Sequence, residues 1–147
     1  MNRRRPAPFL ALTAPLVLVL ATAFPSASVA AGCLKYGAPG VAVVGTIVVR
    51  NVLGAPGFGA TPKVDRKERL AILKLESPAC VDASADNEER SETEQREITL
   101  VPSGNADVFR HEGRRVSASG VLFHSISGHD QTLLLMEVKR TPSLAAP

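Results

Sequence analysis

The apolar run Val41–Arg50, V-A-V-V-G-T-I-V-V-R, constrains the fold of this chain more than any other feature. It is nearly continuous and rich in β-branched residues, which is typical of a central β-strand. Turn-forming residues divide the rest of the chain into further short apolar runs, with no internal repeat and no heptad. Short runs between turn signals predict an all-β domain.

Four more strands complete the expected sheet. The second lies within Lys63–Val81 and ends at Pro78, and the others lie at Glu97–Val101, Arg114–Phe123 and Gln131–Arg140. In the last two, apolar and polar side chains alternate, as expected for strands with one buried face.

The connections between these strands indicate the architecture. Asn51–Pro62 is rich in Gly and Pro and predicts a flexible loop. Asp82–Arg96 predicts a solvated loop, with an acidic surface for a partner or a cation as the alternative, and Ser103–Gly113 is expected to hold one helical turn. Gly45 and Gly120 fall inside strands, where barrels bend sharply. We therefore predict a small five-stranded barrel of the oligonucleotide/oligosaccharide-binding type (OB-like), with one short helical turn, and a small β-sandwich as the alternative.

Residues 1–30 show the three parts of a secretory signal peptide. Three arginines precede the apolar run Leu10–Phe24, and small residues follow it, so cleavage is expected after Ala30 or Ala31. A membrane anchor is the alternative, but the run is shorter than the roughly 20 apolar residues of a span, and Pro15 interrupts it.

Removal of this leader changes the charge balance. The chain has 17 Lys and Arg against 14 Asp and Glu. The leader contains three of the arginines and no acid, so the mature chain would be close to neutral. Nucleic-acid binding needs a basic footprint, so nucleic acid is not an expected partner. We expect one OB-like domain at residues 31–141, a loose tail at 142–147, and no transmembrane span after cleavage.

The chain has two cysteines, Cys33 and Cys80. In an exported protein an even pair predicts a disulfide, which we expect here. The alternative for Cys33 is a lipid anchor, because Ala-Gly-Cys resembles the end of a lipoprotein signal. Cys33 is also close to the mature N-terminus, where a disulfide would hold a fraying end.

The loop L-F-H-S-I-S-G-H-D-Q-T, Leu122–Thr132, is the main candidate site. If it forms a hairpin, His124, His129 and Asp130 could supply three ligands to zinc or copper. The alternative is a structural turn in which Gly128 takes a positive φ and the hydroxyl and carboxylate groups bond to the backbone. No other cofactor is expected.

The segment Gly113–Val138 resembles a bacterial family known as domain of unknown function 4431. That family typically reads G-K-x-V-x-V-x-G-x-L-F-H-A-H-T-G-H-H-H-T before an apolar strand. In the histidine-rich part of this signature, the chain keeps His124, Gly128, His129 and Thr132. It has Ile126, Asp130 and Gln131 where the family has histidines. The resemblance implies an exported domain with paired cysteines and brings no activity.

Other candidates for a binding rim are one exposed aromatic residue and a basic cluster: Phe58, Arg110, Arg114 and Arg115. No nucleophile elbow, H-E-x-x-H motif or paired-carboxylate pattern occurs, so we do not expect an enzyme. We predict a non-enzymatic binding or accessory module of the cell envelope, periplasmic or secreted, with an unknown protein or small ligand as partner. A metal-binding protein that uses His124 and His129 is the alternative.

Overall fold

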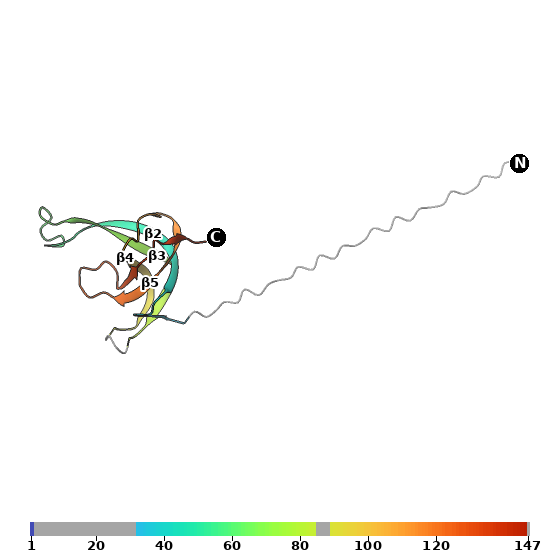
Figure 1. Cartoon of the computed structure of the whole chain (residues 1–147), viewed down its shortest axis with the longest axis horizontal. Coiled ribbons are helices and arrows are strands. Elements are labelled where there is room, and N and C mark those ends of the chain that lie inside the picture. Colours follow the sequence, from blue (N-terminus) through green and yellow to red (C-terminus); the bar gives the residue numbers. More distant parts are fainter. Residues whose placement is uncertain (2–31, 85–88, 147) are drawn as a thin grey trace. The chain divides into compact units, whose positions relative to one another are not determined.

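The structure is a computed structural model that describes Met1 and residues 32–84 and 89–146 (Figure 1). The expected signal peptide, apart from Met1, and its two cleavage sites lie outside the described residues. From residue 32 onward, the described chain belongs to one compact unit, Ala31–Pro147. The described residues contain no helix with the length and apolar character needed to cross a membrane.

Seven strands lie in the described part of this unit. They are β1 (Leu34–Lys35), β2 (Val41–Leu53), β3 (Lys67–Asp82), β4 (Glu92–Pro102), β5 (Arg115–His124), β6 (Leu134–Val138) and β7 (Ser143–Leu144). The five long strands pair in the order β3-β2-β5-β6-β4, and β4 pairs with β3 to close the ring. The β4–β6 pair is parallel and the other four pairs of the ring are antiparallel. The expected five-stranded OB-like barrel is therefore confirmed.

The core of the barrel receives side chains from every strand of the ring. Each strand contributes at least one fully buried residue, for example Ile47, Leu73, Ile98, Leu122 and Met136. The alternation predicted for β5 and β6 places their inward-facing residues in this core, as expected.

Gly45 and Gly120 lie where neighbouring strands approach closely. A Cβ atom at Gly45 would overlap the carbonyl oxygen of Lys74, and one at Gly120 would overlap the carbonyl oxygen of Glu137. The absence of a side chain therefore permits the close strand contacts of a small barrel.

Several strands differ from their expected bounds. β2 continues to Leu53, inside the predicted loop Asn51–Pro62, and β6 is shorter than predicted, at Leu134–Val138. β3 continues through Pro78 to Asp82, and its register with β4 shifts between Lys74 and Ala79. Pro78 has no N–H for a ladder hydrogen bond, and an irregular stretch of pairing tolerates this loss. β4 begins at Glu92, within the segment that the sequence predicts to be a loop.

The expected helical turn at Ser103–Gly113 is not present. This segment consists of turns, and the structure assigns no helix to the described residues. Its isolated i to i+3 bonds, such as Glu112 N–H to the Phe109 carbonyl at 3.1 Å, do not follow one another along the chain. Gly104 has a φ angle of 63°, which a right-handed helix does not allow.

The C-terminal tail is paired rather than loose. β7 pairs with β5 through Val116↔Leu144 and Ser117↔Ser143. The Ala145 N–H extends this pairing by donating to the Arg115 carbonyl at 3.1 Å. The tail has no apolar run long enough to predict a strand.

Cys33 and Cys80 form the expected disulfide, with 4.7 Å between their Cα atoms and a sequence separation of 47. The bond fastens the start of the described domain to β3, which β1 joins in parallel pairing. A lipid thioether on Cys33 would need the same sulfur atom, so the disulfide and the lipid anchor exclude each other.

Candidate functional site

Two loops flank a cleft of about 410 Å³. One loop, residues 54–66, joins β2 to β3, and the other, residues 125–133, joins β5 to β6. Side chains of β3 and β4 also line the space between them. We call this space the loop cleft.

A buried aspartate organises the β2–β3 loop. One Asp65 carboxylate oxygen accepts hydrogen bonds from the Gly57 N–H (2.7 Å) and the Thr61 hydroxyl (2.7 Å). The other accepts from the Gly59 N–H (2.8 Å) and the Thr61 N–H (3.2 Å). Burial favours the neutral acid, but the Thr61 hydroxyl and the three N–H donors outweigh it and lower the pKa of Asp65. A charged carboxylate therefore holds the loop in one conformation.

This conformation presents Phe58 at the mouth of the loop cleft. Phe58 has a φ of 48°, which is unusual for a residue with a side chain, and its side chain is 45% exposed. The Phe58 N–H donates to the Gly54 carbonyl at 3.0 Å. Phe58 is thus the exposed aromatic residue that the sequence suggested.

A second aspartate organises the β5–β6 loop. Asp130 Oδ2 accepts hydrogen bonds from the Ser125 hydroxyl (2.8 Å) and the Ser127 N–H (3.1 Å). The Ser127 hydroxyl accepts from the His129 N–H at 3.2 Å, which fixes the backbone of the next residues. These contacts are the side-chain-to-backbone bonds expected of a structural turn.

The two loops meet through their rings. The rings of Phe58 and His129 are stacked, with 4.0 Å between centroids and an interplanar angle of 6°. Each ring has one face against the other, and both residues remain exposed. Both residues of the stack line the loop cleft.

The floor of the loop cleft is apolar and firmly connected to the barrel. Leu70, Val101 and Leu135 line it from three different strands. Thr132 joins two of these strands, since its hydroxyl accepts from the Thr99 N–H at 3.1 Å and donates to the Leu134 carbonyl at 2.6 Å. The floor is therefore part of the rigid sheet.

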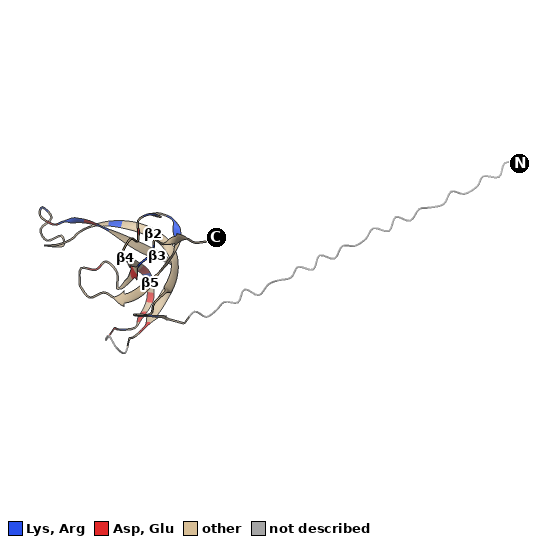
Figure 2. Cartoon of the chain, viewed as in Figure 1, with Lys and Arg blue, Asp and Glu red and all other residues tan. Residues whose placement is uncertain are grey.

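The charged groups of the loop cleft are acidic. Glu68 and Asp130 line it, and no Lys or Arg does. Figure 2 shows basic residues farther out on the β2–β3 hairpin and acidic residues near the start of β4. An anionic ligand would meet carboxylates inside the cleft, whereas a neutral ligand with hydroxyl groups would find hydrogen-bond acceptors.

His124 lies at the base of the β5–β6 loop. Its Nδ1 is 2.8 Å from the Ser125 carbonyl oxygen, and its Nε2 is 3.0 Å from Glu92 Oε1. Both nitrogens face acceptors, so the charged, doubly protonated ring satisfies them best. The Ser125 carbonyl, Glu92 and Glu89 together raise the pKa of His124 against the opposing effect of burial.

The surroundings of His124 give it a structural role. Its main-chain N–H donates to Glu89 Oε1 at 3.1 Å, so residues 89–92 are fastened to the end of β5. Tyr36 packs edge-on against the imidazole, with 6.3 Å between ring centroids. Burial, together with the charges of Glu92 and Glu89, raises the pKa of Tyr36 to about 12.

The three predicted metal ligands have separate partners. His124 bonds to Glu92, His129 stacks on Phe58, and Asp130 binds Ser125 and Ser127. In the part of the chain that the structure describes, no group of three or more His, Cys, Asp or Glu residues is arranged to hold a metal ion.

The prediction for Gly128 is wrong. Positive φ angles occur at five other glycines and not at Gly128. A Cβ atom at Gly128 would meet nothing within 4 Å. The Asp130 and Ser127 hydrogen bonds define the turn instead, so it does not require glycine.

The predicted basic rim is not part of the loop cleft. Arg110 and Arg114 are exposed and do not line it. The Arg115 guanidinium binds Glu76, with 2.9 Å between Nη2 and Oε2, on the outer surface. Of the four suggested rim residues, only Phe58 lines the loop cleft.

Sequence reasoning missed Asp65, Glu92 and Thr99 as organisers of this region. Asp65 lies among loop residues with no motif around it, and Glu92 lies in the segment expected to be solvated. The sequence places Thr99 in a strand and indicates no partner for its hydroxyl. Their importance depends on long-range partners, which a single sequence does not reveal.

Comparisons with family models, curated proteins and solved structures find no match for this chain. The resemblance of Gly113–Val138 to domain of unknown function 4431 therefore stays a prediction.

Proposed function

We propose that this protein is an exported, non-enzymatic binding module of the cell envelope and that the loop cleft is its binding surface. The Phe58–His129 stack carries the proposal, because it joins two ordered loops beside an apolar floor. In OB-type barrels, the equivalent sheet face and the two loops beside it bind oligosaccharides and oligonucleotides.

The charges of the loop cleft favour an oligosaccharide over an oligonucleotide. Nucleic-acid sites are basic, whereas Glu68 and Asp130 are the charged residues that line this cleft. Carboxylates accept hydrogen bonds from sugar hydroxyls, and the exposed Phe58 ring offers an apolar face to a sugar ring. We therefore propose a neutral, hydroxyl-rich ligand of the oligosaccharide class.

Two features support binding rather than catalysis. Both ring nitrogens of His124 are engaged by the Ser125 carbonyl and Glu92, so this histidine is poorly placed to act as a general base. Cys33 and Cys80 are bonded to each other, so neither offers a nucleophilic thiol.

Export is supported by the leader-like residues 1–30 and by the disulfide, which persists in oxidising compartments. Intact mass spectrometry of protein from its own envelope or medium tests this proposal. We expect a chain that begins near residue 31 and weighs two hydrogens less than its reduced form. A chain that keeps its leader and has free thiols would contradict export.

Titration of ¹⁵N-labelled protein with chitotetraose and maltotetraose tests the ligand class. We expect at least one sugar to shift the backbone amides of the β2–β3 and β5–β6 loops, and Phe58→Ala to weaken that response. Ile126→Ala is the control, because Ile126 is an exposed apolar residue of the β5–β6 loop and does not line the loop cleft. The proposed ligand class is rejected if neither sugar shifts these amides, or if the anionic oligonucleotide dT8 shifts them more strongly.

A further inference from the structure

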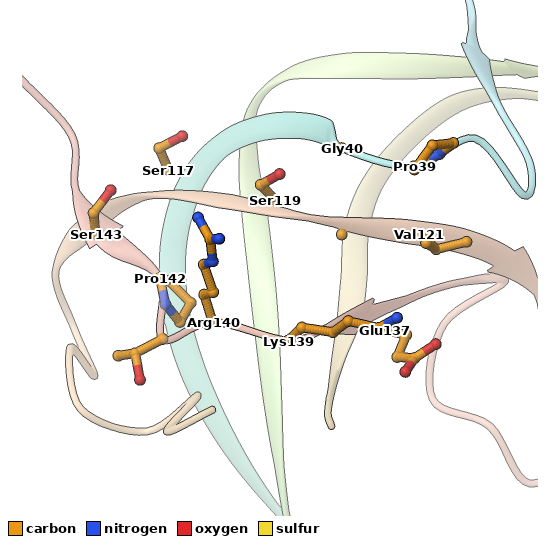
Figure 3. A pocket seen from close by; sticks show the side chains of 12 residues that line it. Pro39, Gly40, Ser117, Ser119, Val121, Glu137, Lys139, Arg140, Pro142 and Ser143 are labelled. Carbon is orange, nitrogen blue, oxygen red and sulfur yellow. The ribbon is translucent and has the colours of Figure 1, made fainter. Parts of the chain in front are cut away.

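A second cleft, of about 520 Å³, lies on another part of the barrel (Figure 3). Its walls are the outward-facing side of β5, the turn at Pro39 and Gly40, and the segment 137–143. It shares no lining residue with the loop cleft. Its volume lies in the range of small-molecule sites. We call it the seam cleft.

The seam cleft lies beside β5, in the gap between the part of β5 that pairs with β6 and the part that pairs with β7. The β5–β6 pairing ends at Val121↔Glu137, and the β5–β7 pairing begins at Ser117↔Ser143. Ser119, midway between them, has no partner in either pairing. The Arg115 carbonyl accepts a hydrogen bond from the Ala145 N–H, so it points to the edge of β5 that faces β7. The backbone groups of every second residue in a strand point to the same edge, so the Ser119 N–H also points there.

The outer wall of the seam cleft is anchored to the barrel at both ends. The Thr141 hydroxyl accepts a hydrogen bond from the Asp107 N–H at 2.9 Å, and Pro142 is buried. Beyond them, β7 is paired with β5. The seam cleft is therefore formed before any ligand binds.

The polar groups of the seam cleft are suited to an anion. Lys139 and Arg140 line it, with Glu137 as the one carboxylate among its lining residues. Neither cation forms an ion pair with another described residue. Figure 3 shows the Arg140 side chain extending toward β5, between Ser117 and Ser119, while Lys139 extends toward the Glu137 end.

We propose that the seam cleft binds a small organic anion, with its carboxylate or phosphate group held by Arg140 and by the hydroxyls of Ser117 and Ser119. A guanidinium donates two parallel hydrogen bonds to either group, and hydroxyls complete the set of donors. The body of the ligand lies against Val121 and the neighbouring proline rings, which supply the apolar surface.

Three probes with one sugar body test this proposal: glucose 6-phosphate, glucuronate and neutral glucose. Each is titrated into ¹⁵N-labelled, disulfide-bonded protein. We expect one or both anions to shift the amides of Ser117, Ser119 and Ser143 at millimolar concentration, and glucose to leave them unchanged. The tighter anion identifies the acidic group as phosphate or carboxylate.

Substitutions then assign the response to Arg140. We expect Arg140→Gln to weaken binding by about tenfold or more. Arg140→Lys keeps the positive charge but loses the two parallel N–H donors, so we expect it to weaken binding less. Arg114→Gln is the control, since Arg114 is exposed and lies outside the seam cleft. The amide spectrum of each variant reports whether it is folded.

The proposal is overturned if neither anion shifts these amides, if glucose shifts them equally, or if folded Arg140→Gln binds as tightly as the unchanged protein. Shifts confined to the β2–β3 and β5–β6 loops would also overturn it and would bear on the loop cleft instead. The binding proposals for the two clefts are therefore tested independently of each other.

Discussion

The ring of Phe58 stacks on the ring of His129, with 4.0 Å between their centroids. Phe58 lies in the loop between β2 and β3, and His129 lies in the loop between β5 and β6. Each loop has its own aspartate, Asp65 or Asp130, whose hydrogen bonds hold the loop. The stack therefore joins two independently ordered loops, and the contact is available without a ligand.

Removal of either ring should reveal this coupling. Stacked aromatic pairs contribute about 0.5–1.5 kcal/mol beyond the area they bury, and an exposed pair should lie at the lower end of that range. A double-mutant cycle of Phe58→Ala and His129→Ala, measured by urea unfolding, should therefore give a coupling free energy of about 0.5–1 kcal/mol. A cycle that pairs Phe58→Ala with Ile126→Ala should give none. A Phe58–His129 coupling no larger than that of the control pair would show that the stack is incidental.

Thr132→Val should destabilise the barrel more than its position in a loop suggests. Thr132 accepts from the Thr99 N–H, and its hydroxyl lies 2.8 Å from the Thr99 hydroxyl. Thr99 is buried, so valine would leave its donors without this partner, at a cost of about 1–3 kcal/mol in the free energy of unfolding. Thr93→Val, at an exposed position of β4, is the control and should change stability little. Equal losses in the two variants would argue against the hydrogen-bond explanation.

Two glycine substitutions should have opposite outcomes. Gly120→Ala places a Cβ atom onto the Glu137 carbonyl, so adjacent strands must separate, and a loss of at least about 2 kcal/mol is expected. Gly128→Ala adds a methyl group to open space at a residue without positive φ and should be nearly neutral. Thermal unfolding of the two proteins side by side measures the difference. A strong destabilisation by Gly128→Ala would show that the β5–β6 turn requires glycine at this position.

The charge of His124 should make stability depend on pH. The charged and polar groups that face its ring are Glu92 and Glu89, Tyr36, and the Ser125 carbonyl. The pKa of His124 is raised in the folded protein, so its stabilising effect is complete below the unfolded-state pKa of about 6.5. That effect is lost as the pH rises through the higher folded-state pKa.

Melting temperatures measured from pH 5.5 to 9 test the direction of this change. We expect a decline above about pH 6.5 that is absent in His124→Gln, while His129→Gln keeps the decline of the unchanged protein. A profile of His124→Gln that falls in parallel with that of the unchanged protein would exclude this histidine as the source.

Alternation along β5 and β6 was enough to predict the inner face of the barrel. Val116, Ala118 and Leu122 are buried, as are Leu134, Met136 and Val138. This pattern is local to each strand, so a single sequence contains it. The two glycines inside strands were also informative, because close backbone contact leaves few alternatives to glycine.

The remaining features depend on partners far away in the chain. Pro78 predicts a strand end by local rules, yet the irregular pairing with β4 allows β3 to pass through it. The tail has no strand pattern, yet the free side of β5 pairs with it. Within the candidate site, the sequence identified Phe58, His124, His129 and Asp130 but not which residues they contact. Glu92, for example, is 32 residues from His124.

The position of β6 has a consequence for the order in which this protein can fold. β6 is the last long strand, and it pairs with both β4 and β5, so the ring has no closure without it. Any chain leaves the ribosome, or a translocation channel, with its N-terminus first. The hairpin of β2 and β3 can therefore assemble early, but the buried core stays open to water until the C-terminal segment emerges. Truncation just before Leu134 should leave an open sheet with two exposed edges, which is a form prone to aggregation.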